Sequence, residues 1–390
     1  MSERLTDIKG PLEDPPKRPK KFKQHPLARK TGSNSQPGWK GSLSSRARVS
    51  KKLPQAVVKI TSHNSGRKNV LNRLNYISRE GELPLETEEG LLVEGKKEIS
   101  EYLDAWTPDF STRKNGRDGM SLVLSVPHGT DREAAIKSAR EFLIEEFSEN
   151  HHYAFVPHDD KDHLHIHVVI KNRGHDGKQL PTQKADLRRW RENFAKKARE
   201  NGIMLDASPR YARGRGRKET KTVIHQIRAR GETPRVDKQA AAEAIAAARG
   251  EQPAKTEFED KLEKTNARER VAFAQQAASV VDASKGIADQ HKRVVSLELA
   301  AEMAKYADGM PVPKTRREVM IEAIKPANQS SKPGIEIAKP LIKKIEEGIR
   351  DAVPRISDPK LQQRAVKAHR QIAALLQERD RSRPGPQVER

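Results

Sequence analysis

Four histidines lie within ten residues near the middle of the chain, in the segment His-Asp-Asp-Lys-Asp-His-Leu-His-Ile-His that begins at residue 158. His163, His165 and His167 alternate with apolar residues, so on a β-strand the three imidazoles would project from one face. His158 precedes a polar turn and could fold back to complete the cluster. Neutral imidazole is the commonest metal ligand, and three ligands leave positions open for a substrate oxygen. The pattern therefore predicts a divalent metal centre.

The alternatives to this metal centre are a solvated polar strand face and a structural zinc. Asp160 and Asp162 are suited to fixing the ring tautomers, because a carboxylate can accept a hydrogen bond from the second nitrogen of a ligating imidazole. Hydrolases of the metallo-β-lactamase type also begin with closely spaced histidines, but they place an Asp-His pair after the first two. They need further ligands downstream, where only His175 and His225 are in range, so this class ranks well below.

A metal that polarises a phosphate still needs an attacking group. The chain has no cysteine, which excludes thiolate catalysis and leaves Ser, Thr, Tyr, Lys, a carboxylate or water as the nucleophile. Of five tyrosines, Tyr76 stands apart because it lies in a predicted helix directly after the first predicted strand, between Asn75 and Arg79. The alternative is an ordinary surface tyrosine of an amphipathic helix.

The elements that position these residues follow from hydrophobic periodicity and turn signals. We expect strands at 56–60, 119–126, 153–157 and 164–171, with a polar loop at 61–68. We expect helices at 69–79, 96–106, 132–147 and 183–201, the third with Asp131 as its N-cap. Strands joined by a short turn imply antiparallel pairing. The predicted fold class is therefore α+β, an antiparallel sheet with helices on one face.

The composition changes on both sides of this compact part, which we assign to residues 54–215. Residues 1–53 are basic and rich in Gly, Ser and Pro, so we predict a disordered arm, either DNA-embracing or a solvated linker. Residues 216–390 predict Ala-rich helices with little tertiary core and a flexible basic end. The chain is thus expected to carry one compact domain and a helical, partly disordered carboxy-terminal region.

The charge balance constrains the partner. A formal charge of +22 in 390 residues points to a polyanion, with nucleic acid as the first candidate and an anionic membrane surface as the second. No long uncharged apolar run is present, and residues 1–10 lack the apolar core of a signal peptide, so no membrane insertion is expected. The absence of cysteine is compatible with a reducing cytoplasm.

Two motifs together carry a resemblance to a known family. The segment Leu-Asn-Arg-Leu-Asn-Tyr-Ile-Ser-Arg-Glu-Gly at 71–81, paired with the His-x-Asp-x-x-His-x-His-x-His motif at 158–167, resembles the relaxases, the mobilisation nucleases of conjugative and mobilisable plasmids. Among these it is similar to the P-type family, which includes the T-DNA border endonuclease of the virulence transfer system. A third segment, Asn-Gly-Ile-Met-Leu-Asp-Ala-Ser at 201–208, looks like the end of that family's catalytic domain. The resemblance covers about residues 54–215.

Carried over residue by residue, the resemblance implies that Tyr76 is the nucleophile. The metal ligands that it implies are His158, His165 and His167. His163 would then be a neighbour of the metal, unless it exchanges roles with His158. The implied fold is a five-stranded antiparallel sheet with helices, the His-hydrophobic-His endonuclease or relaxase fold, which has one strand more than periodicity finds.

Other residues near the motifs receive roles from the same comparison. Asp160 or Asp162 would orient a metal ligand or help to deprotonate Tyr76. Cations close to the nucleophile could hold phosphates, although a plain charged helix face would look the same. These cations are Arg67, Lys68, Arg73 and Arg79.

The activity implied is site- and strand-specific nicking of DNA at a transfer origin by tyrosine transesterification, which leaves a covalent 5′-phosphotyrosine for conjugative or T-DNA-type transfer. Mg²⁺ or Mn²⁺ is the implied cofactor. The implied partners are single-stranded DNA, an accessory relaxosome protein and a type IV secretion coupling protein that reads a signal at the carboxy terminus. The protein would be bacterial and cytoplasmic, and exported with the DNA.

Three alternatives to this activity stay open. A His-metal phosphodiesterase or nuclease would use activated water and release free 5′-phosphates. A replication initiator would share the tyrosine chemistry. A basic DNA-binding protein with a structural metal would bind DNA and leave it intact.

Overall fold

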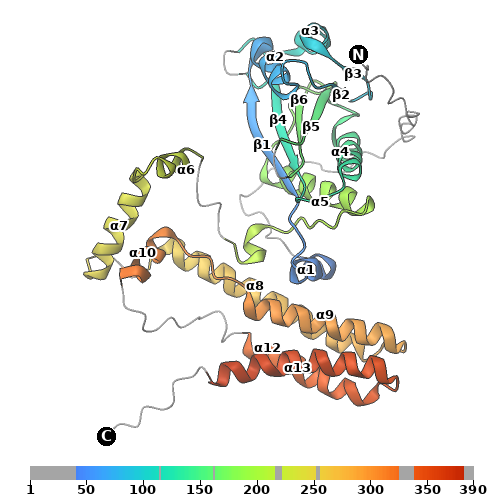
Figure 1. Cartoon of the computed structure of the whole chain (residues 1–390), viewed down its shortest axis with the longest axis vertical. Helices are drawn as coiled ribbons and strands as arrows, with labels where there is room; N and C mark the ends of the chain where they lie inside the picture. Colours follow the sequence, from blue (N-terminus) through green and yellow to red (C-terminus); the bar gives the residue numbers. More distant parts are fainter. Residues whose placement is uncertain are drawn as a thin grey trace, which may run out of the picture. The chain divides into compact units, whose positions relative to one another are not determined.

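A computed structural model describes residues 41–113, 116–160, 163–215, 222–251, 255–324 and 338–381 (Figure 1). These residues fall into two compact units, one of residues 56–205 and one of residues 41–55 together with 206–381. Each unit has its own hydrophobic cluster and is described by itself. None of the helices in the described ranges combines the length and the apolar character that a membrane span requires.

The first unit is built on a six-stranded antiparallel sheet in the order β1-β4-β6-β5-β2-β3. Its strands are β1 (Val57–Asn64), β2 (Leu85–Thr87), β3 (Leu92–Val93), β4 (Gly119–Ser125), β5 (Tyr153–His158) and β6 (His165–Lys171). The predicted α+β class is confirmed, but the sheet has six strands where five were expected. The hairpin of β2 and β3 was missed because strands of three and two residues are too short to show a period.

Strand β1 runs through part of the predicted polar loop. Ser62, His63 and Asn64 pair with β4 after an irregularity in the register. Such residues carry no β signal of their own, so the pairing with the neighbouring strand decides their conformation. This extension places three polar side chains beside the helix that follows.

Helices cover both faces of the sheet, so the expectation of a single covered face is wrong. The helices of this unit are α2 (Gly66–Ile77), α3 (Gly95–Asp104), α4 (Arg132–Phe147) and α5 (Lys184–Glu200), with the 3-10 turn η1 (Thr107–Asp109). The apolar sides of α2 and α3 pack on Ala154, Val156 and Val169. Their strand neighbours Phe155 and Val168 point to the other face and are equally buried. On that face α4 packs against α5 through aromatic pairs (Figure 1).

The predicted N-cap of α4 is confirmed. The Asp131 carboxylate accepts a hydrogen bond of 2.6 Å from the Ala134 amide. This contact satisfies one of the amides that a helix leaves without a partner at its first turn.

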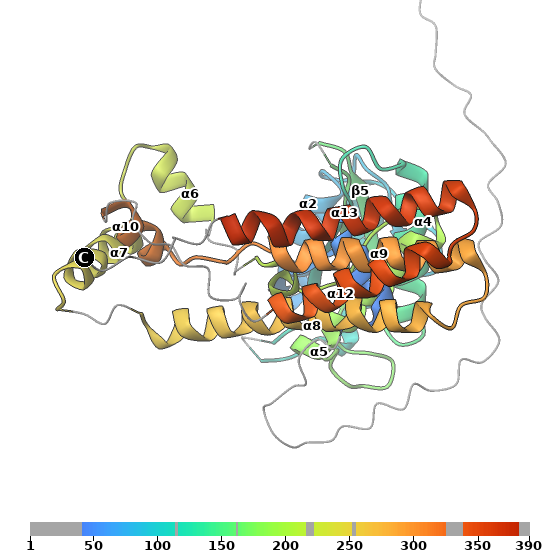
Figure 2. The ribbon, with the colours of Figure 1, turned by 90° about the horizontal axis from the view of Figure 1, so that it is seen from below.

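The second unit is helical. Its elements are α1 (Leu43–Ser50), η2 (Arg210–Arg213), α6 (Thr222–Ala229), α7 (Arg235–Ala248), α8 (Glu257–Ser284), α9 (Gln290–Gly309), α10 (Arg316–Ile324), α12 (Lys339–Ala352), η3 (Val353–Arg355) and α13 (Pro359–Arg381). Figure 2 shows α8, α9, α12 and α13 side by side. Little tertiary core was expected here, yet these helices share a cluster that includes Phe273, Leu297 and Ile345. Alanines fill much of the remaining contact surface, because small side chains let helices approach closely.

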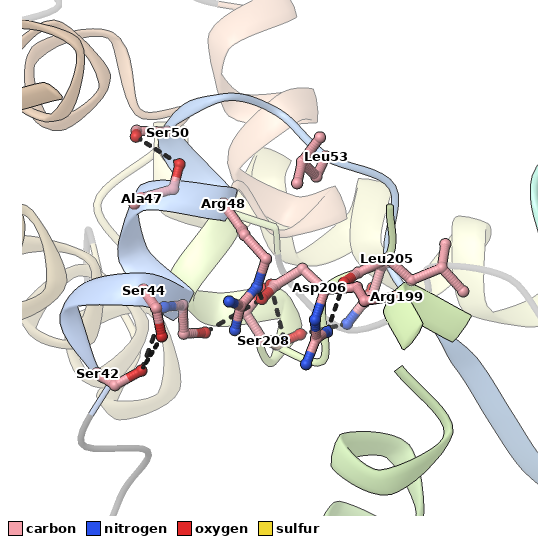
Figure 3. A network of polar contacts seen from close by, with 12 residues as sticks. Ser42, Ser44, Ala47, Arg48, Ser50, Leu53, Arg199, Leu205, Asp206 and Ser208 are labelled. Carbon is pink, nitrogen blue, oxygen red and sulfur yellow. Dashed lines mark hydrogen bonds and ion pairs between the residues drawn. The ribbon is translucent and has the colours of Figure 1, made fainter. Parts of the chain in front are cut away.

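Helix α1 lies in the stretch predicted as a disordered arm, so residues 43–50 differ from that prediction. Its cations reach carboxylates far along the chain, with Arg48 on Asp206 at 3.1 Å and Arg46 on Glu269 at 3.4 Å. Figure 3 shows the polar network around Asp206. The helix is stabilised by these distant partners, which local composition does not reveal.

Candidate active site

Three of the predicted histidines come together at one end of the sheet. His158 ends β5 and pairs across the ladder with His165, which begins β6, while His167 lies two residues further along β6. Each residue offers a ligand nitrogen, and these nitrogens all lie within 4.8 Å of one another. The ring centroids are 4.6 Å apart for His158 and His167 and 5.0 Å apart for His165 and His167. The two-residue period of β6 and the antiparallel register thus assemble the cluster.

Backbone carbonyls orient two of these rings. The Nε2 atom of buried His158 lies 2.6 Å from the carbonyl oxygen of Ile77, and Nδ1 of His165 lies 3.3 Å from the carbonyl of His163. A carbonyl oxygen only accepts, so these nitrogens carry the protons and the opposite nitrogens carry the lone pairs. Oriented neutral imidazoles of this kind are what a protein metal site requires. The residues therefore fit a divalent ion.

The type of donor also bears on which ion fits. Imidazole nitrogen suits transition metals, whereas Mg²⁺ prefers oxygen ligands and keeps much of its water. A site with three nitrogen donors therefore favours a transition ion over Mg²⁺.

The other predicted residues of the motif take separate places. His163 is exposed, precedes β6 and stands outside the three-histidine group, with its ring centroid 6.0 Å from that of His165. Asp160 lies beside His165 and Arg79, with its oxygens 3.4 Å from His165 Nε2 and 3.5 Å from Arg79 Nη2. Desolvation raises the pKa of Asp160, but the neighbouring His165, a backbone hydrogen bond, His158 and Arg79 lower it below its usual value. Asp162 lies outside the described residues.

Tyr76 is the most exposed of the chain's five tyrosines. It is the penultimate residue of α2, and 63% of its surface is accessible. Tyr102 and Tyr153 have raised pKa values because they are desolvated by burial, and burial raises the pKa of Tyr306 to about 12. Tyr211 is partly buried in η2. A nucleophilic hydroxyl must reach substrate, and Tyr76 alone presents its ring openly.

One hydrogen bond links the nucleophile candidate to the histidine cluster. Ile77, whose carbonyl accepts from His158, directly follows Tyr76 at the end of α2. The Ile77 side chain is buried in the core beneath α2. The end of the helix that carries Tyr76 is therefore fixed to a residue of the candidate metal centre. This contact could not be expected from the sequence, because it joins residues 81 positions apart.

Of the four predicted phosphate-holding cations, Arg73 contacts the ring of the candidate nucleophile. Its guanidinium lies 5.0 Å from the centroid of the Tyr76 ring, and its Nε donates to the hydroxyl of Ser121 at 3.0 Å. Arg67 is instead held by Asp104 at 2.7 Å, and Arg79 by Asp160. Lys68 is exposed.

A polar groove borders Tyr76 and Arg73. Its volume is about 570 Å³, and its lining contains no acidic side chain. The lining residues are Ser62, His63, Asn64, Ser65, Asn69, Asn72, Arg73 and Tyr76. The hydroxyl of Ser121 connects Arg73 on α2 with two groove residues of β1, because it contacts Ser62 at 3.0 Å and Asn64 at 3.1 Å. Sequence analysis missed these β1 residues by assigning them to a loop, although their side chains alternate along an extended strand.

Comparison with known proteins agrees with this geometry. Residues 76–203 match the family model described as "Relaxase: MobA/VirD2-like, nuclease domain", a segment that begins at Tyr76 and contains all three clustered histidines. The chain is 28% identical over 165 residues to the T-DNA border endonuclease VirD2 of Rhizobium radiobacter, which covers 37% of this chain and 39% of the relative. It is 29% identical to the corresponding protein of Rhizobium rhizogenes, covering 37% and 38%.

These matches define the domain and its limits. The chain contains a MobA/VirD2-like relaxase nuclease domain and is distantly similar to the border endonucleases. The match spans less than two-fifths of the length of those relatives. No solved structure gives a significant match.

Proposed function

We propose that this chain nicks one strand of DNA at a transfer origin and becomes covalently attached to the new 5′ end through Tyr76. The observation that carries the proposal is the joining of the exposed Tyr76 to the three-histidine cluster through the Ile77 carbonyl. A hydrolase that uses activated water has no need of a tyrosine fixed in this way. The relaxase nuclease match over residues 76–203 supports the same chemistry.

The reaction exchanges one phosphodiester for another. The Tyr76 hydroxyl oxygen attacks phosphorus and loses its proton, a Tyr–O–P bond forms, and the bond to the 3′ oxygen breaks. The departing oxygen gains a proton and becomes a free 3′-OH. Because the bond types nearly match, the same residues can rejoin ends after transfer.

The chain's own residues divide the work in this proposal. His158, His165 and His167 would hold the divalent ion, and Asp160 lies beside His165. When bound, such an ion neutralises negative charge that develops on the phosphate. Arg73 places a positive charge beside Tyr76, where it stabilises the bound phosphate. We propose Mn²⁺ before Mg²⁺ because the three donors are nitrogens.

The wider setting is proposed by similarity to the border endonucleases. The substrate is single-stranded DNA, because the groove beside Tyr76 offers polar and cationic side chains to one strand. An accessory protein would open the duplex, and a type IV secretion coupling protein would read the carboxy-terminal region. We propose residues 54–215 as the nicking domain and 216–390 as the region that contacts these partners.

The covalent intermediate provides the test. Wild-type protein, Tyr76→Phe and the control Tyr211→Phe would be incubated with labelled single-stranded oligonucleotides of the cognate origin and Mn²⁺, with and without EDTA. We expect a protein–DNA band on a denaturing gel for the wild type and the control, and none for Tyr76→Phe or with EDTA. Cutting by all three proteins with free 5′-phosphates would replace this proposal with hydrolysis by activated water.

A further inference from the structure

A second hollow lies in the first unit, at the end of β4 and β6 away from the histidine cluster. Its volume is about 660 Å³, and its lining comes from residues 108–113, 116, 117, 172, 173, 179, 180 and 182. Gly119 and Lys171 pair at this end of the two strands, whereas His165 begins β6 at the other. Seven residues of strand separate the two ends, which is roughly 20 Å at 3.3 Å per residue. The hollow is therefore distinct from the histidine cluster.

The hollow carries three arginines, Arg113, Arg117 and Arg173, all of them exposed. Within the described ranges none of the three forms an ion pair, in contrast to Arg67 with Asp104 on the same unit. We propose that this arginine hollow binds backbone phosphates of the DNA strand that Tyr76 nicks, a few nucleotides from the scissile bond. The inference rests on the proposed function, since it takes that strand as the ligand.

The acidic residues near the arginines do not cancel this charge. Asp109, the one acid in the lining, is paired with the buried Lys171 at 2.6 Å. Asp118 is buried, and its carboxylate accepts from the amides of Gly66 at 2.6 Å and Ser111 at 2.7 Å. The hollow thus keeps a local positive excess. A planar guanidinium presents paired donors that match phosphate oxygens, which makes arginine well suited to that anion.

Hydrogen bonds link the lining of the hollow to the groove beside Tyr76. The amide of Asp118 donates to the carbonyl of Asn64, a groove residue, at 2.9 Å. The side-chain amide of Asn172, which lines the hollow, donates to the carbonyl of Arg117 at 3.0 Å. Both surfaces therefore meet around residues 117 and 118. A nucleic acid strand leaving Tyr76 along α2 would reach the arginines without crossing an exposed unpaired carboxylate of either lining.

The length of α2 sets the distance between Tyr76 and the arginine hollow. Gly66 at its start contacts Asp118, and Tyr76 lies ten residues later. At 1.5 Å per residue this is about 15 Å, which corresponds to about four nucleotides at the 3.4 Å rise of one DNA strand and fewer if the strand is extended. The arginines should accordingly engage phosphates on one side of the nick only.

Salt dependence tests the contacts directly. Binding of fluorescent oligothymidylate of 16 nucleotides would be measured in EDTA over a range of salt concentrations. The proteins compared are the wild type, the Arg113→Ala/Arg117→Ala/Arg173→Ala variant, the corresponding triple Lys variant, and a charge-matched control, Lys137→Ala/Lys184→Ala/Lys196→Ala. The control removes three exposed cations from α4 and α5. Each phosphate contact with single-stranded DNA contributes about 0.7 to the slope of log K against log salt.

We expect the triple Ala variant to lose about 2 from that slope and to bind on the order of tenfold to a hundredfold more weakly at physiological salt. The triple Lys variant should keep most of the slope, which separates lost charge from misfolding, and the control should keep the wild-type slope. A triple Ala slope equal to that of the control would overturn the inference. The inference would also be overturned if hexadecaglutamate displaced the oligothymidylate from the wild type as effectively as unlabelled DNA does. In that case the site would not distinguish DNA from an acidic peptide.

Trimming of the cognate strand locates the contact. The cognate strand would be shortened separately on each side of the nick, so that only about four nucleotides remain on that side. For the wild type we expect the shortening to raise KM on one side of the nick and not on the other. For the triple Ala variant we expect no rise in KM on either side. Equal sensitivity of both proteins to trimming would refute the placement. A wild-type protein that binds DNA with the predicted slope but never nicks would defeat the proposed function and leave the arginine subsite standing.

Discussion

The carboxylate of Asp206 offers the sharpest test of what holds the second unit together. Its side chain has 0% exposure and lies 3.1 Å from Arg48 Nε and 3.0 Å from Arg213 Nη2. It also accepts from the Ser45 hydroxyl at 3.2 Å and from the Ser208 amide at 2.9 Å (Figure 3). Substitution by alanine removes the shared acceptor and leaves two guanidinium groups without their anion. Breaking a buried ion pair in this way costs about 3–5 kcal/mol, so we expect Asp206→Ala to destabilise this unit by that amount.

The same carboxylate makes a prediction about pH. Burial raises the pKa of Asp206, but the hydrogen bonds from Ser208, Arg48 and Arg213 outweigh burial and lower it below its usual value. A group whose pKa is depressed by folding stabilises the folded state above its unfolded pKa, which is about 3.9 for aspartate. That contribution disappears as the pH falls through the lower folded value. Acidification below about pH 4 should therefore narrow the stability gap between wild type and Asp206→Ala.

Urea unfolding of the full chain can resolve this effect. Trp106 and Trp190 belong to the first unit, so in a Trp39→Phe background tryptophan fluorescence reports on that unit, while far-ultraviolet circular dichroism is dominated by the helices of the second. The matched control is Asp282→Ala, which removes a carboxylate that is 45% exposed and paired with Lys285 and Lys344. Exposed pairs contribute about 1 kcal/mol or less. An Asp206→Ala variant no less stable than Asp282→Ala would refute the argument that this buried network stabilises the unit.

Two further predictions concern the surroundings of Tyr76. Arg73→Met should lower the rate of covalent adduct formation about 100-fold, because it removes a cation beside the proposed nucleophile. Arg67→Met, which removes a cation already paired with Asp104, should leave that rate nearly unchanged. Equal rates for the two variants would contradict the role of Arg73. Gly81→Ala should destabilise the first unit by about 1–3 kcal/mol, because Gly81 has φ +89° and an added Cβ would lie 2.6 Å from Gly95 Cα. Gly129→Ala, at φ +74° with nothing within 4 Å, is the control, and a urea midpoint shifted equally by both substitutions would show that the contact with Gly95 costs nothing.

Sequence analysis was most successful where the signal is local. Three of the four long strands and the four long helices of the first unit were predicted close to their observed bounds, because each shows a hydrophobic period or a clear turn on either side, whereas the predicted first strand ended four residues before β1 does. The clustering of His165 and His167 follows from the same two-residue period. The polar turn after His158 already suggested that this residue could fold back to the cluster, the resemblance made it a ligand, and the antiparallel register between β5 and β6 supplies the physical reason.

What escaped prediction depends on partners far away in the sequence. Helix α1 is stabilised by Asp206 and Glu269, so its basic composition looked like that of a disordered arm. Arg67 looked as suitable for phosphate as Arg73, and only the fold shows that Asp104, 37 residues later, already holds it. The three arginines of the second hollow come from two loops that the sheet brings together, and neither loop has a period or motif.

The contact between His158 and Ile77 changes how the two halves of the candidate site should be viewed. Because His158 uses Nε2 to fix the end of α2, only Nδ1 remains for a metal, and one histidine of the candidate metal centre also fixes the position of the candidate nucleophile. The peptide that accepts this hydrogen bond is next to Tyr76, and the chain then turns through three residues of positive φ, Arg79, Glu80 and Gly81. Such a backbone is costly and persists only when its surroundings hold it. The buried Ile77 and the packing of Gly81 against Gly95 provide that support. The position of Tyr76 is therefore set by the tertiary structure and not by α2 alone, which is why an amphipathic-helix pattern could not distinguish it from an ordinary surface tyrosine.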